Sequence, residues 1–220
     1  MNDYPKDVQQ NHGKIIMLST NTGPGSGKTT ASEFLEDLIP GVVATLSFAS
    51  PLKAMLRELL YLWVGSSWEA DAMVYDELKD IVIDGMGENV TPRKLMQTLG
   101  TEWREMIDRD LWVKMAVLEA ERHLLRGHTV VFDDLRFPHE LEFFRAHKWP
   151  CKTDIFHINL DRPAGTALIA GMSGQLFITA GSHKSEGGLS DITPDFQIDN
   201  TGSKEDLLNM LEIFVESSLK

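Results

Sequence analysis

A glycine-rich segment with one lysine and two threonines most directly implies chemistry in this sequence. Residues 22–30 read Thr-Gly-Pro-Gly-Ser-Gly-Lys-Thr-Thr, after a predicted buried strand and at the start of a predicted helix. Glycines let backbone N–H groups converge on phosphate oxygens, and a helix N-terminus adds partial positive charge. In this pattern Lys28 can reach the β- and γ-phosphates, and the Thr29 hydroxyl can ligate Mg²⁺. The segment therefore predicts a phosphate loop.

The predicted loop departs from the strict pattern at one position. The pattern G-x-x-x-x-G-K-[ST] has glycine where this chain has Thr22, and the other glycines must compensate. The alternative, a glycine-rich turn with a chance lysine, is disfavoured by the strand before it and the helix after it. The candidate contacts to the triphosphate are Gly23, Gly25, Ser26, Gly27, Lys28, Thr29 and Thr30.

A phosphate loop by itself leaves kinase, GTPase and ATPase open. A GTPase should carry a base-reading Asn-Lys-x-Asp, which is absent from the sequence, and 220 residues are few for a motor ATPase. A kinase for a small molecule is therefore the leading class.

A second group of charged residues follows an apolar run at 129–133. A carboxylate at a strand end beside a phosphate loop can hold Mg²⁺ or accept a proton from the attacking group, and Asp133 and Asp134 are both candidates. Arg136, two residues beyond Asp134, can clamp a phosphate in a bidentate manner. The alternative is a solvated turn with a helix-capping aspartate.

Three further segments offer contacts to an acceptor. Lys53 lies on the first turn of a predicted helix, where its charge and the helix dipole favour a phosphate. Arg93 and Gln97 are four residues apart and share one helix face, suited to a phosphate and a base edge. Each is equally compatible with an ordinary solvated side chain. Trp112 is more typical of a core position than of base stacking.

Several later residues are weaker candidates when taken singly. Arg162 and Asn200 each follow a predicted strand and could frame a nucleotide, although taken singly each is more typical of a loop position than of a ligand contact. His157 lies in an apolar strand and is more typical of a structural histidine with a satisfied hydrogen bond.

Short apolar strands alternate with helices along the chain, which predicts a parallel sheet covered on both faces. In such sheets ligands bind at the carboxyl ends of the strands. The predicted strands are 14–20, 42–48, 129–133, 154–160 and 196–198. The predicted helices are 27–38, 51–64, 69–83, 91–99, 110–126, 139–147 and one capped by Ser203. Residues 1–13 are polar and are expected to form a mobile tail.

Composition bounds the function further. The formal net charge is −12, so binding to nucleic acid or to an anionic membrane is disfavoured. No apolar run approaches the roughly 20 residues that span a bilayer. The single cysteine, Cys151, excludes an intramolecular disulfide and a cysteine-based zinc site, and fits a reducing cytoplasm. We therefore expect a cytoplasmic protein with one domain over 14–220.

Taken together, these segments resemble the deoxynucleoside monophosphate kinases of tailed bacteriophages. The resemblance extends from Ile15 to the C-terminal helix. Its most specific part is Arg-x-Leu-Met-Gln-x-Leu-Gly-Thr at 93–101, followed by Asp-x-Trp-Val-Lys at 110–114. The other matching motifs are the phosphate loop, Ala49-x-Pro51-Leu52-Lys53, Asp134-x-Arg136-x-x-His139-Glu140, Arg162-Pro163 and Asn200-x-Gly202-Ser203.

The resemblance implies a three-layer αβα phosphate-loop fold with a parallel sheet of about five strands. It implies a helical acceptor-binding region at 49–110 and a lid at 162–190. The implied reaction moves the γ-phosphoryl of ATP, with Mg²⁺, onto a deoxynucleoside 5′-monophosphate, and the family also suggests a homodimer.

The resemblance also implies roles for individual residues. Lys28 and Thr29 serve ATP and the metal, and Asn200 lies on the ATP side. Asp134, rather than Asp133, positions the metal or the acceptor. The residues implied to contact the acceptor or neutralise the transferred phosphoryl are Lys53, Arg93, Gln97, Arg104, Trp112, Arg136 and Arg162.

Two other functions remain open from the sequence. One is a phosphate-loop kinase for a different phosphorylated acceptor, such as dephospho-coenzyme A. The other is a regulatory protein that binds ATP without transferring its phosphoryl group.

The predicted lid contains no arginine between Gly165 and Leu189. Arg136 and Arg162 are therefore the residues expected to neutralise the charge on the transferred phosphoryl group.

Overall fold

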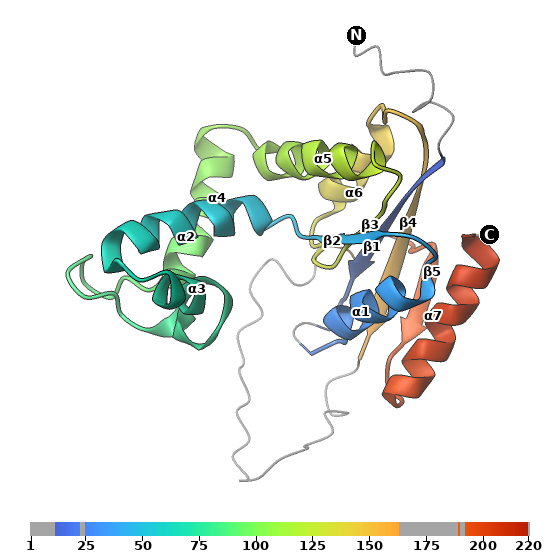
Figure 1. Cartoon of the computed structure of the whole chain (residues 1–220), viewed down its shortest axis with the longest axis horizontal. Helices are drawn as coiled ribbons and strands as arrows, with labels where there is room; N and C mark the ends of the chain where they lie inside the picture. The colour runs from blue at the N-terminus through green and yellow to red at the C-terminus, as the bar shows by residue number, and fades with distance from the viewer. Residues whose placement is uncertain (1–11, 23–24, 163–188, 190–191, 220) are drawn as a thin grey trace. The chain divides into compact units, whose positions relative to one another are not determined.

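The computed structural model describes residues 12–22, 25–162, 189 and 192–219 (Figure 1). The chain divides into two compact units. The first comprises residues 1–47 and 119–220, and the second comprises residues 48–118. Within the described residues, no helix is both long and apolar enough to cross a membrane.

The first unit is built on a five-stranded parallel sheet. Its strands are β1 (His12–Ser19), β2 (Val43–Leu46), β3 (Thr129–Phe132), β4 (Lys152–Asp161) and β5 (Phe196–Asp199). They are arranged in the order β2-β3-β1-β4-β5, and every neighbouring pair is parallel. The parallel sheet and the number of strands predicted from the sequence are confirmed. Because all five strands run the same way, their carboxyl ends lie at one edge.

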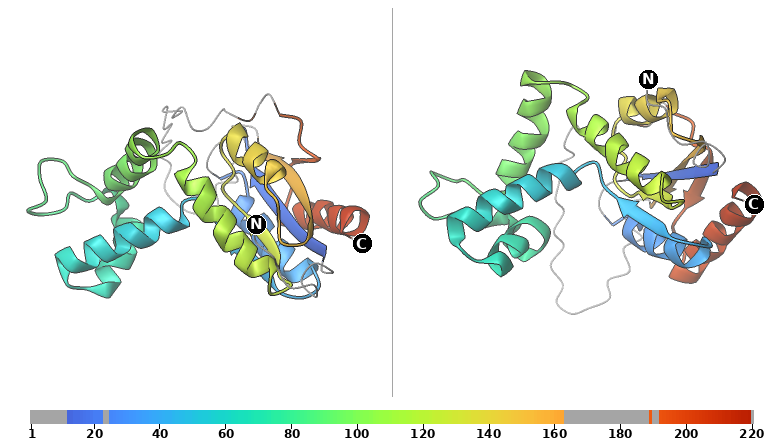
Figure 2. Two further views of the ribbon diagram at one scale, coloured as in Figure 1. Left: turned by 90° about the horizontal axis from the view of Figure 1, so that it is seen from above. Right: turned by 45° about the horizontal axis from the view of Figure 1, so that its top comes forward.

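Helices cover both faces of this sheet, as Figures 1 and 2 show. On one face, α1 (Lys28–Leu38) and α7 (Lys204–Ser218) bury a core of aliphatic and aromatic side chains against β1, β4 and β5. On the other face lie α6 (Pro138–Ala146) and the second half of α5 (Leu111–Leu124). Phe144 of α6 meets Phe132 of β3 edge-on at 5.1 Å between ring centroids. The predicted three-layer α/β architecture is confirmed.

The second unit is helical. It contains α2 (Ser50–Val64), α3 (Ser67–Tyr75), the 3₁₀ helix η2 (Glu77–Asp80) and α4 (Pro92–Met106). Buried side chains of α2 and α3 form its core, against which Leu95, Met96 and Leu99 of α4 pack. This periodicity turns the opposite face of α4 to solvent.

Two predicted helices in this unit have different boundaries in the structure. The single helix predicted over 69–83 begins earlier, because the Ser66 hydroxyl accepts from the Glu69 N–H, and it ends at Tyr75. Asp76, with φ of −123° and ψ of −141°, then leaves the helical conformation and separates α3 from η2. The helix predicted to stop at Gly100 continues to Met106. A glycine costs a helix only about 1 kcal/mol relative to alanine, and packing of Trp103 against Trp112 favours the extra turn.

The predicted helix caps agree with the structure. The Thr91 hydroxyl accepts from the Lys94 N–H at 3.2 Å, and Pro92 begins α4. Ser203 and Asp206 form a reciprocal capping box at the start of α7. Side-chain oxygens at these positions satisfy N–H groups that have no partner within the helix.

A row of polar side chains crosses the sheet near its carboxyl edge. Ser19, Asn159 and Gln197 are register partners on β1, β4 and β5. The Ser19 hydroxyl donates to Asn159 Oδ1 at 2.8 Å, and Asn159 Nδ2 donates to Gln197 Oε1 at 3.2 Å. His157 and Asp161 flank this row on β4, two residues to either side of Asn159. We call these five residues the polar row.

His157 is held as a neutral ring. Its Nε2 lies 2.7 Å from the Ser19 hydroxyl. Because that hydroxyl proton is donated to Asn159, Nε2 must carry the ring proton and Nδ1 must be unprotonated. Nδ1 is buried and has no hydrogen-bond partner. Burial disfavours the charged ring and lowers the pKa of His157 to about 4.

This burial predicts a pH-dependent stability. Between pH 6.5 and 4 the unfolded histidine binds more protons than the folded one, so the free energy of unfolding falls as the pH falls through this window. From pH 7 to 4.5 the loss due to His157 should be on the order of 2–3 kcal/mol. His157→Gln keeps an N–H donor near the Nε2 position and cannot titrate. Urea unfolding across this range should show a flatter pH profile for His157→Gln, and parallel profiles would contradict the assignment.

Candidate active site

The described part of the phosphate loop has a backbone that requires glycine. Gly25 and Gly27 have φ of 85° and 96°, in the left-handed region that other L-residues avoid. Gly27 is the N-cap of α1, so Lys28 and Thr29 occupy its first turn. The Lys28 ammonium lies 3.4 Å from the Ser26 hydroxyl. Gly23 and Pro24 lie outside the described residues.

The carboxyl ends of β4 and β5 contact the loop at three points. The Asn21 N–H donates to Asp161 Oδ1 at 3.1 Å, and the Arg162 N–H donates to the Thr22 hydroxyl at 3.0 Å. Asn200 Nδ2 donates to the Ser26 carbonyl at 2.8 Å. Thr22, which departs from the glycine pattern, thus uses its hydroxyl to join the loop to the end of β4.

Asn200 lies beneath the loop. It is 6% exposed, and a Cβ on Gly27 would collide with its Nδ2. The absence of a side chain at Gly27 is therefore needed for this contact as well as for the positive φ. Asn200, which the resemblance implies to lie on the ATP side of the site, contacts the backbone of the phosphate loop through its amide.

Asp134 lies at the same edge of the sheet. It accepts a hydrogen bond from the Ser47 hydroxyl at 2.5 Å, at the end of β2. The Leu135 N–H donates to the Leu18 carbonyl at 3.1 Å, which ties this segment to β1. The structure therefore brings Asp134 to the strand ends beside the loop, as the topology of a parallel sheet requires.

A buried carboxylate holds the segment that carries Arg136. Glu140 is 6% exposed, and its Oε2 accepts from the N–H groups of Arg136 and Phe137, both at 2.9 Å. These bonds fix the backbone while the Arg136 side chain stays exposed. An arginine so placed can reach a ligand without moving its main chain.

The acceptor candidates lie in the helical unit. Arg93 and Gln97 are exposed on α4, on the face opposite its core side chains. Arg93 forms two hydrogen bonds to Asp80, at 2.6 and 2.9 Å. This contact raises the pKa of Arg93 and lowers the pKa of Asp80. The guanidinium is thus already oriented for a bidentate partner.

Trp112 has the burial expected of a core residue. It is 6% exposed and stacks on Trp103 with 6.2 Å between ring centroids. Its indole Nε1 is nevertheless buried and makes no hydrogen bond. Lys53 and Arg104 are partly buried on α2 and α4.

Three residues that support the site are not predicted from the sequence: Asp161 and Gln197, beside the loop, and Glu140, which holds the Arg136 segment. One signal was present: polar residues recur at alternate positions 157, 159 and 161 of an otherwise apolar strand, so they share one face of the sheet. What they contact depends on strands β1 and β5, which are distant in sequence.

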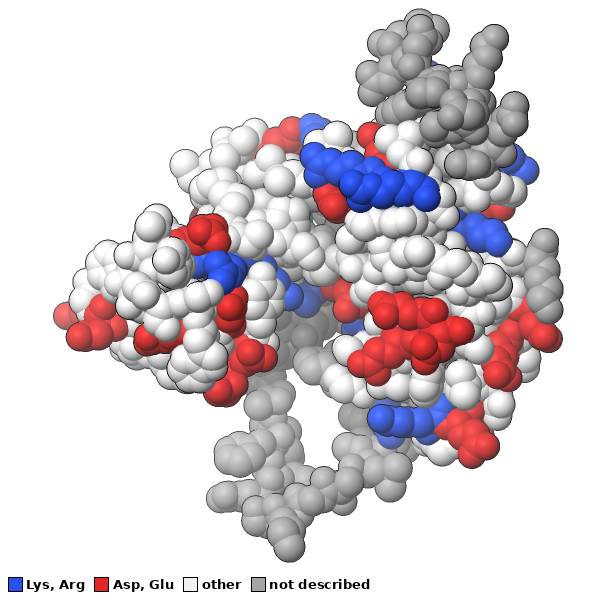
Figure 3. All heavy atoms as spheres, viewed as in Figure 1, with Lys and Arg blue, Asp and Glu red and all other residues white. Residues whose placement is uncertain are grey.

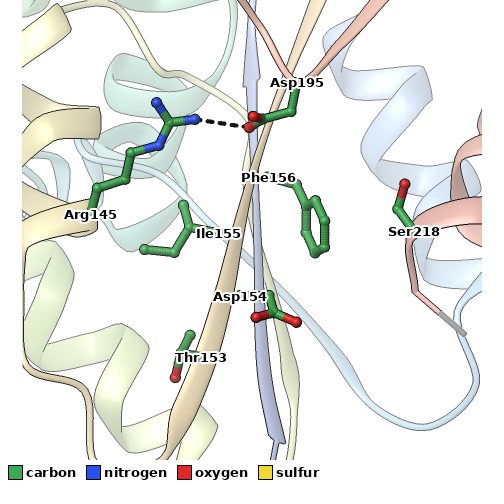
Figure 4. Close-up of a pocket in the computed structure, with 7 residues that line it drawn as sticks. All are labelled: Arg145, Thr153, Asp154, Ile155, Phe156, Asp195 and Ser218. Carbon is green, nitrogen blue, oxygen red and sulfur yellow. Dashed lines mark hydrogen bonds and ion pairs between the residues drawn. The ribbon is translucent and has the colours of Figure 1, made fainter.

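A shallow surface hollow lies away from the strand ends that carry these residues (Figure 4). It covers the first half of β4, where Asp154 and Phe156 line it beside the Arg145–Asp195 ion pair of 2.9 Å. Because the candidate phosphate-side residues lie at the carboxyl ends of the strands, this hollow over the first half of β4 is not the candidate site.

Charge is unevenly distributed on the face drawn in Figure 3. Acidic side chains gather over α1, and the basic side chains visible there are scattered. That face therefore offers no continuous basic patch to a polyanion.

Comparison with known proteins identifies the family. A family model described as deoxynucleotide monophosphate kinase matches residues 64–211. The chain belongs to the deoxynucleotide monophosphate kinase family. A protein of Acanthamoeba polyphaga mimivirus, provisionally named as a deoxynucleotide monophosphate kinase, is 29% identical over 167 residues, which cover 68% of this chain and 75% of the relative. This kinase is therefore an ATP-dependent phosphotransferase that acts on a nucleotide monophosphate, as the resemblance implied.

Solved structures of other kinases resemble the chain more distantly. A cysteine-to-alanine mutant of the Mycobacterium tuberculosis APS kinase CysC is 16% identical, with a TM-score of 0.45 and coverage of 93% of this chain and 99% of its own. A sugar kinase from Janibacter is 14% identical, with a TM-score of 0.49 and coverage of 94% and 96%.

The contact between Gly27 and Asn200 can be tested with a matched pair of glycines. Gly41 has the same φ of 96° as Gly27, but open space where a Cβ would lie. Gly41→Ala should cost only the left-handed strain, about 1–2 kcal/mol, and leave ATP binding unchanged. Gly27→Ala adds the collision with Asn200 and should cost more stability and weaken ATP binding about 10-fold or more. Thermal unfolding and calorimetric ATP titration measure both effects; equal behaviour of the two variants would contradict the contact.

Proposed function

We propose that this kinase holds ATP through the segment from Gly23 to Thr30 and transfers its γ-phosphoryl in line to a deoxynucleoside 5′-monophosphate. The observation that carries this proposal is the position of Lys28 and Thr29. They begin α1 directly after glycines of positive φ, and at such a helix N-terminus backbone N–H groups, the helix dipole and an ammonium can together bind phosphate. Lys28 neutralises charge on the β- and γ-phosphates as transfer proceeds.

The helical region at 49–110 is proposed to bind the acceptor. Arg93 supplies the bidentate clamp for the acceptor phosphate, which then replaces the carboxylate of Asp80. Gln97 lies one turn further along the same exposed face, where its amide can contact a base edge. Lys53 and Arg104 add positive charge, and the unpaired indole N–H of Trp112 offers a donor to the nucleotide.

The residues near the loop fit Mg²⁺. Thr29 and Asp134 offer a hydroxyl and a carboxylate oxygen, the hard ligands that this ion prefers. Among the described residues no group of three or more histidine, cysteine, aspartate or glutamate side chains could hold a metal. This agrees with an ion held by one or two protein ligands and by substrate phosphates. When bound, Mg²⁺ would neutralise charge on the phosphates.

Transfer in this mechanism depends on position and charge rather than on covalent chemistry by the protein. Arg136 and Arg162 are proposed to balance charge on the moving phosphoryl group, with Asp134 orienting the acceptor. Residues 162–190 are proposed as a lid that excludes water; 163–188 lie outside the described residues. We further propose a cytoplasmic homodimer that binds neither nucleic acid nor membrane.

An acceptor screen tests the reaction. ADP release from ATP and Mg²⁺ should rise above the rate without acceptor when one or more deoxynucleoside monophosphates is present. Dephospho-coenzyme A tests the rival acceptor. ATP binding with no acceptor-dependent release would favour a regulatory protein instead.

Lys28→Ala should fold normally and lose turnover by roughly 10³-fold or more, because the charge on the transferred group is then poorly balanced. Lys204→Ala removes an exposed lysine at the start of α7 and serves as the control. Circular dichroism establishes folding, and a coupled ADP assay measures kcat. Near-normal activity in Lys28→Ala would exclude this assignment of the loop.

Arg93→Met should raise the KM for the monophosphate by roughly 10- to 100-fold and leave the KM for ATP nearly unchanged, since one bidentate charged contact is lost. Arg122→Met is the matched control. It breaks another exposed arginine–carboxylate pair, with Glu119 on α5, at 2.5 Å. Steady-state kinetics with each substrate varied in turn provides the measurement. An unchanged acceptor KM would remove Arg93 from the acceptor site.

A further inference from the structure

Both described ends of the phosphate loop are attached to one residue, Asp161. Its Oδ1 accepts from the Asn21 N–H at the start of the loop. Its backbone carbonyl accepts from the Asn200 N–H at 2.8 Å, and the Asn200 side chain in turn holds the Ser26 carbonyl. Asp161 therefore fixes the entry of the loop directly and its end through Asn200.

The polar row supplies Asp161 with a fixed orientation. Donors run in one direction, from His157 to Ser19, to Asn159 and to Gln197, whose Nε2 donates to Asp161 Oδ2 at 3.2 Å. Each amide in this series has only one orientation that pairs a donor with an acceptor at both sides. The series ends at Asp161 Oδ2, a carboxylate oxygen that accepts the last of these hydrogen bonds.

Burying the polar side chains of this series costs free energy, and packing alone gives no reason for them to be polar. Ser19, His157 and Asn159 are at most 3% exposed, and polar groups at such positions are unfavourable unless they are hydrogen-bonded. Apolar side chains would fill the same face of the sheet. The series instead leads from the buried His157 to the backbone N–H that begins the phosphate loop.

We propose that Asp161, oriented by Asn159 and Gln197, is a positioning residue that sets the shape of the phosphate loop and thereby the affinity for ATP. This rests on the proposed function in assigning that loop to ATP. Asp161 touches neither substrate in this proposal. It acts by keeping the N–H groups of the loop in a converged arrangement before ATP binds, so that binding does not have to order them.

Asp161→Asn tests the donor direction. The new amide retains an acceptor for the Asn21 N–H but turns a donor toward the donor of Gln197. If Gln197 rotates to accept, its own donor then meets that of Asn159. We expect ATP affinity to fall about 10-fold, which is about 1.4 kcal/mol, with the KM for the monophosphate unchanged.

Combining Asp161→Asn with Asn159→Asp moves the carboxylate along the row and restores a donor–acceptor pair at every step. This double variant should recover part of the lost ATP affinity, which a role in packing alone does not predict. Asp199→Asn is the matched control. Asp199 is the register partner of Asp161 on β5 and is exposed, with no side-chain hydrogen bond to another described residue. The Asp199→Asn variant should bind ATP as tightly as the unmodified protein does.

Calorimetric titration with a non-hydrolysable ATP analogue measures affinity without requiring turnover. The proposal therefore stays testable even if the acceptor screen fails. A loss of affinity for the ATP analogue in Asp161→Asn, with partial recovery in the double variant, would support the positioning role. Affinity within two-fold of the unmodified protein, or equal loss in Asp199→Asn, would overturn it. A variant in which the affinities for ATP and for the monophosphate and the melting temperature all fall together would also overturn the proposal.

Discussion

The site depends on keeping several backbone N–H groups pointed at one place in a segment rich in glycine. Glycine permits the positive φ at Gly25 and Gly27, but the same freedom leaves the segment without a preferred shape. The surrounding fold must supply that shape. Here the ends of β4 and β5 supply it, through Asp161 and Arg162 on one side and Asn200 on the other. The parallel sheet makes this possible because it brings these strand ends beside the end of β1.

The carboxyl edge of the sheet also carries the other residues proposed to face the phosphates. Asp134 and Arg136 follow β3, the neighbour of β1 on the side opposite β4. Ser47 and Glu140 fix this segment by hydrogen bonds, as Asp161 and Asn200 fix the loop. Asp134 and Arg136 therefore each have a polar neighbour, which holds the carboxylate of Asp134 and the backbone of Arg136. This arrangement suits a reaction in which position and charge supply most of the catalysis.

In the helical unit the candidate residues are positioned by helix periodicity and not by strand ends, because they lie on the exposed face of an amphipathic helix. The packing of Leu95, Met96 and Leu99 into its core directs Arg93 and Gln97 to solvent. The Asp80 carboxylate already holds the Arg93 guanidinium in the bidentate geometry that a phosphate would use. The core and the proposed acceptor surface are thus two faces of the same helix.

The sequence by itself determined the local elements and the family. Strand–loop–helix order located the phosphate loop, apolar periodicity located five parallel strands, and threonine and serine caps located two helix starts. It did not locate the break after Tyr75 or the helix continuing through Gly100, because tertiary packing outweighs small backbone preferences there. Only the tertiary structure decided what Asn200 and Asp161 contact. Their partners lie on other segments of the chain, and hydrogen bonds between distant strand ends leave no spacing that a single sequence can reveal.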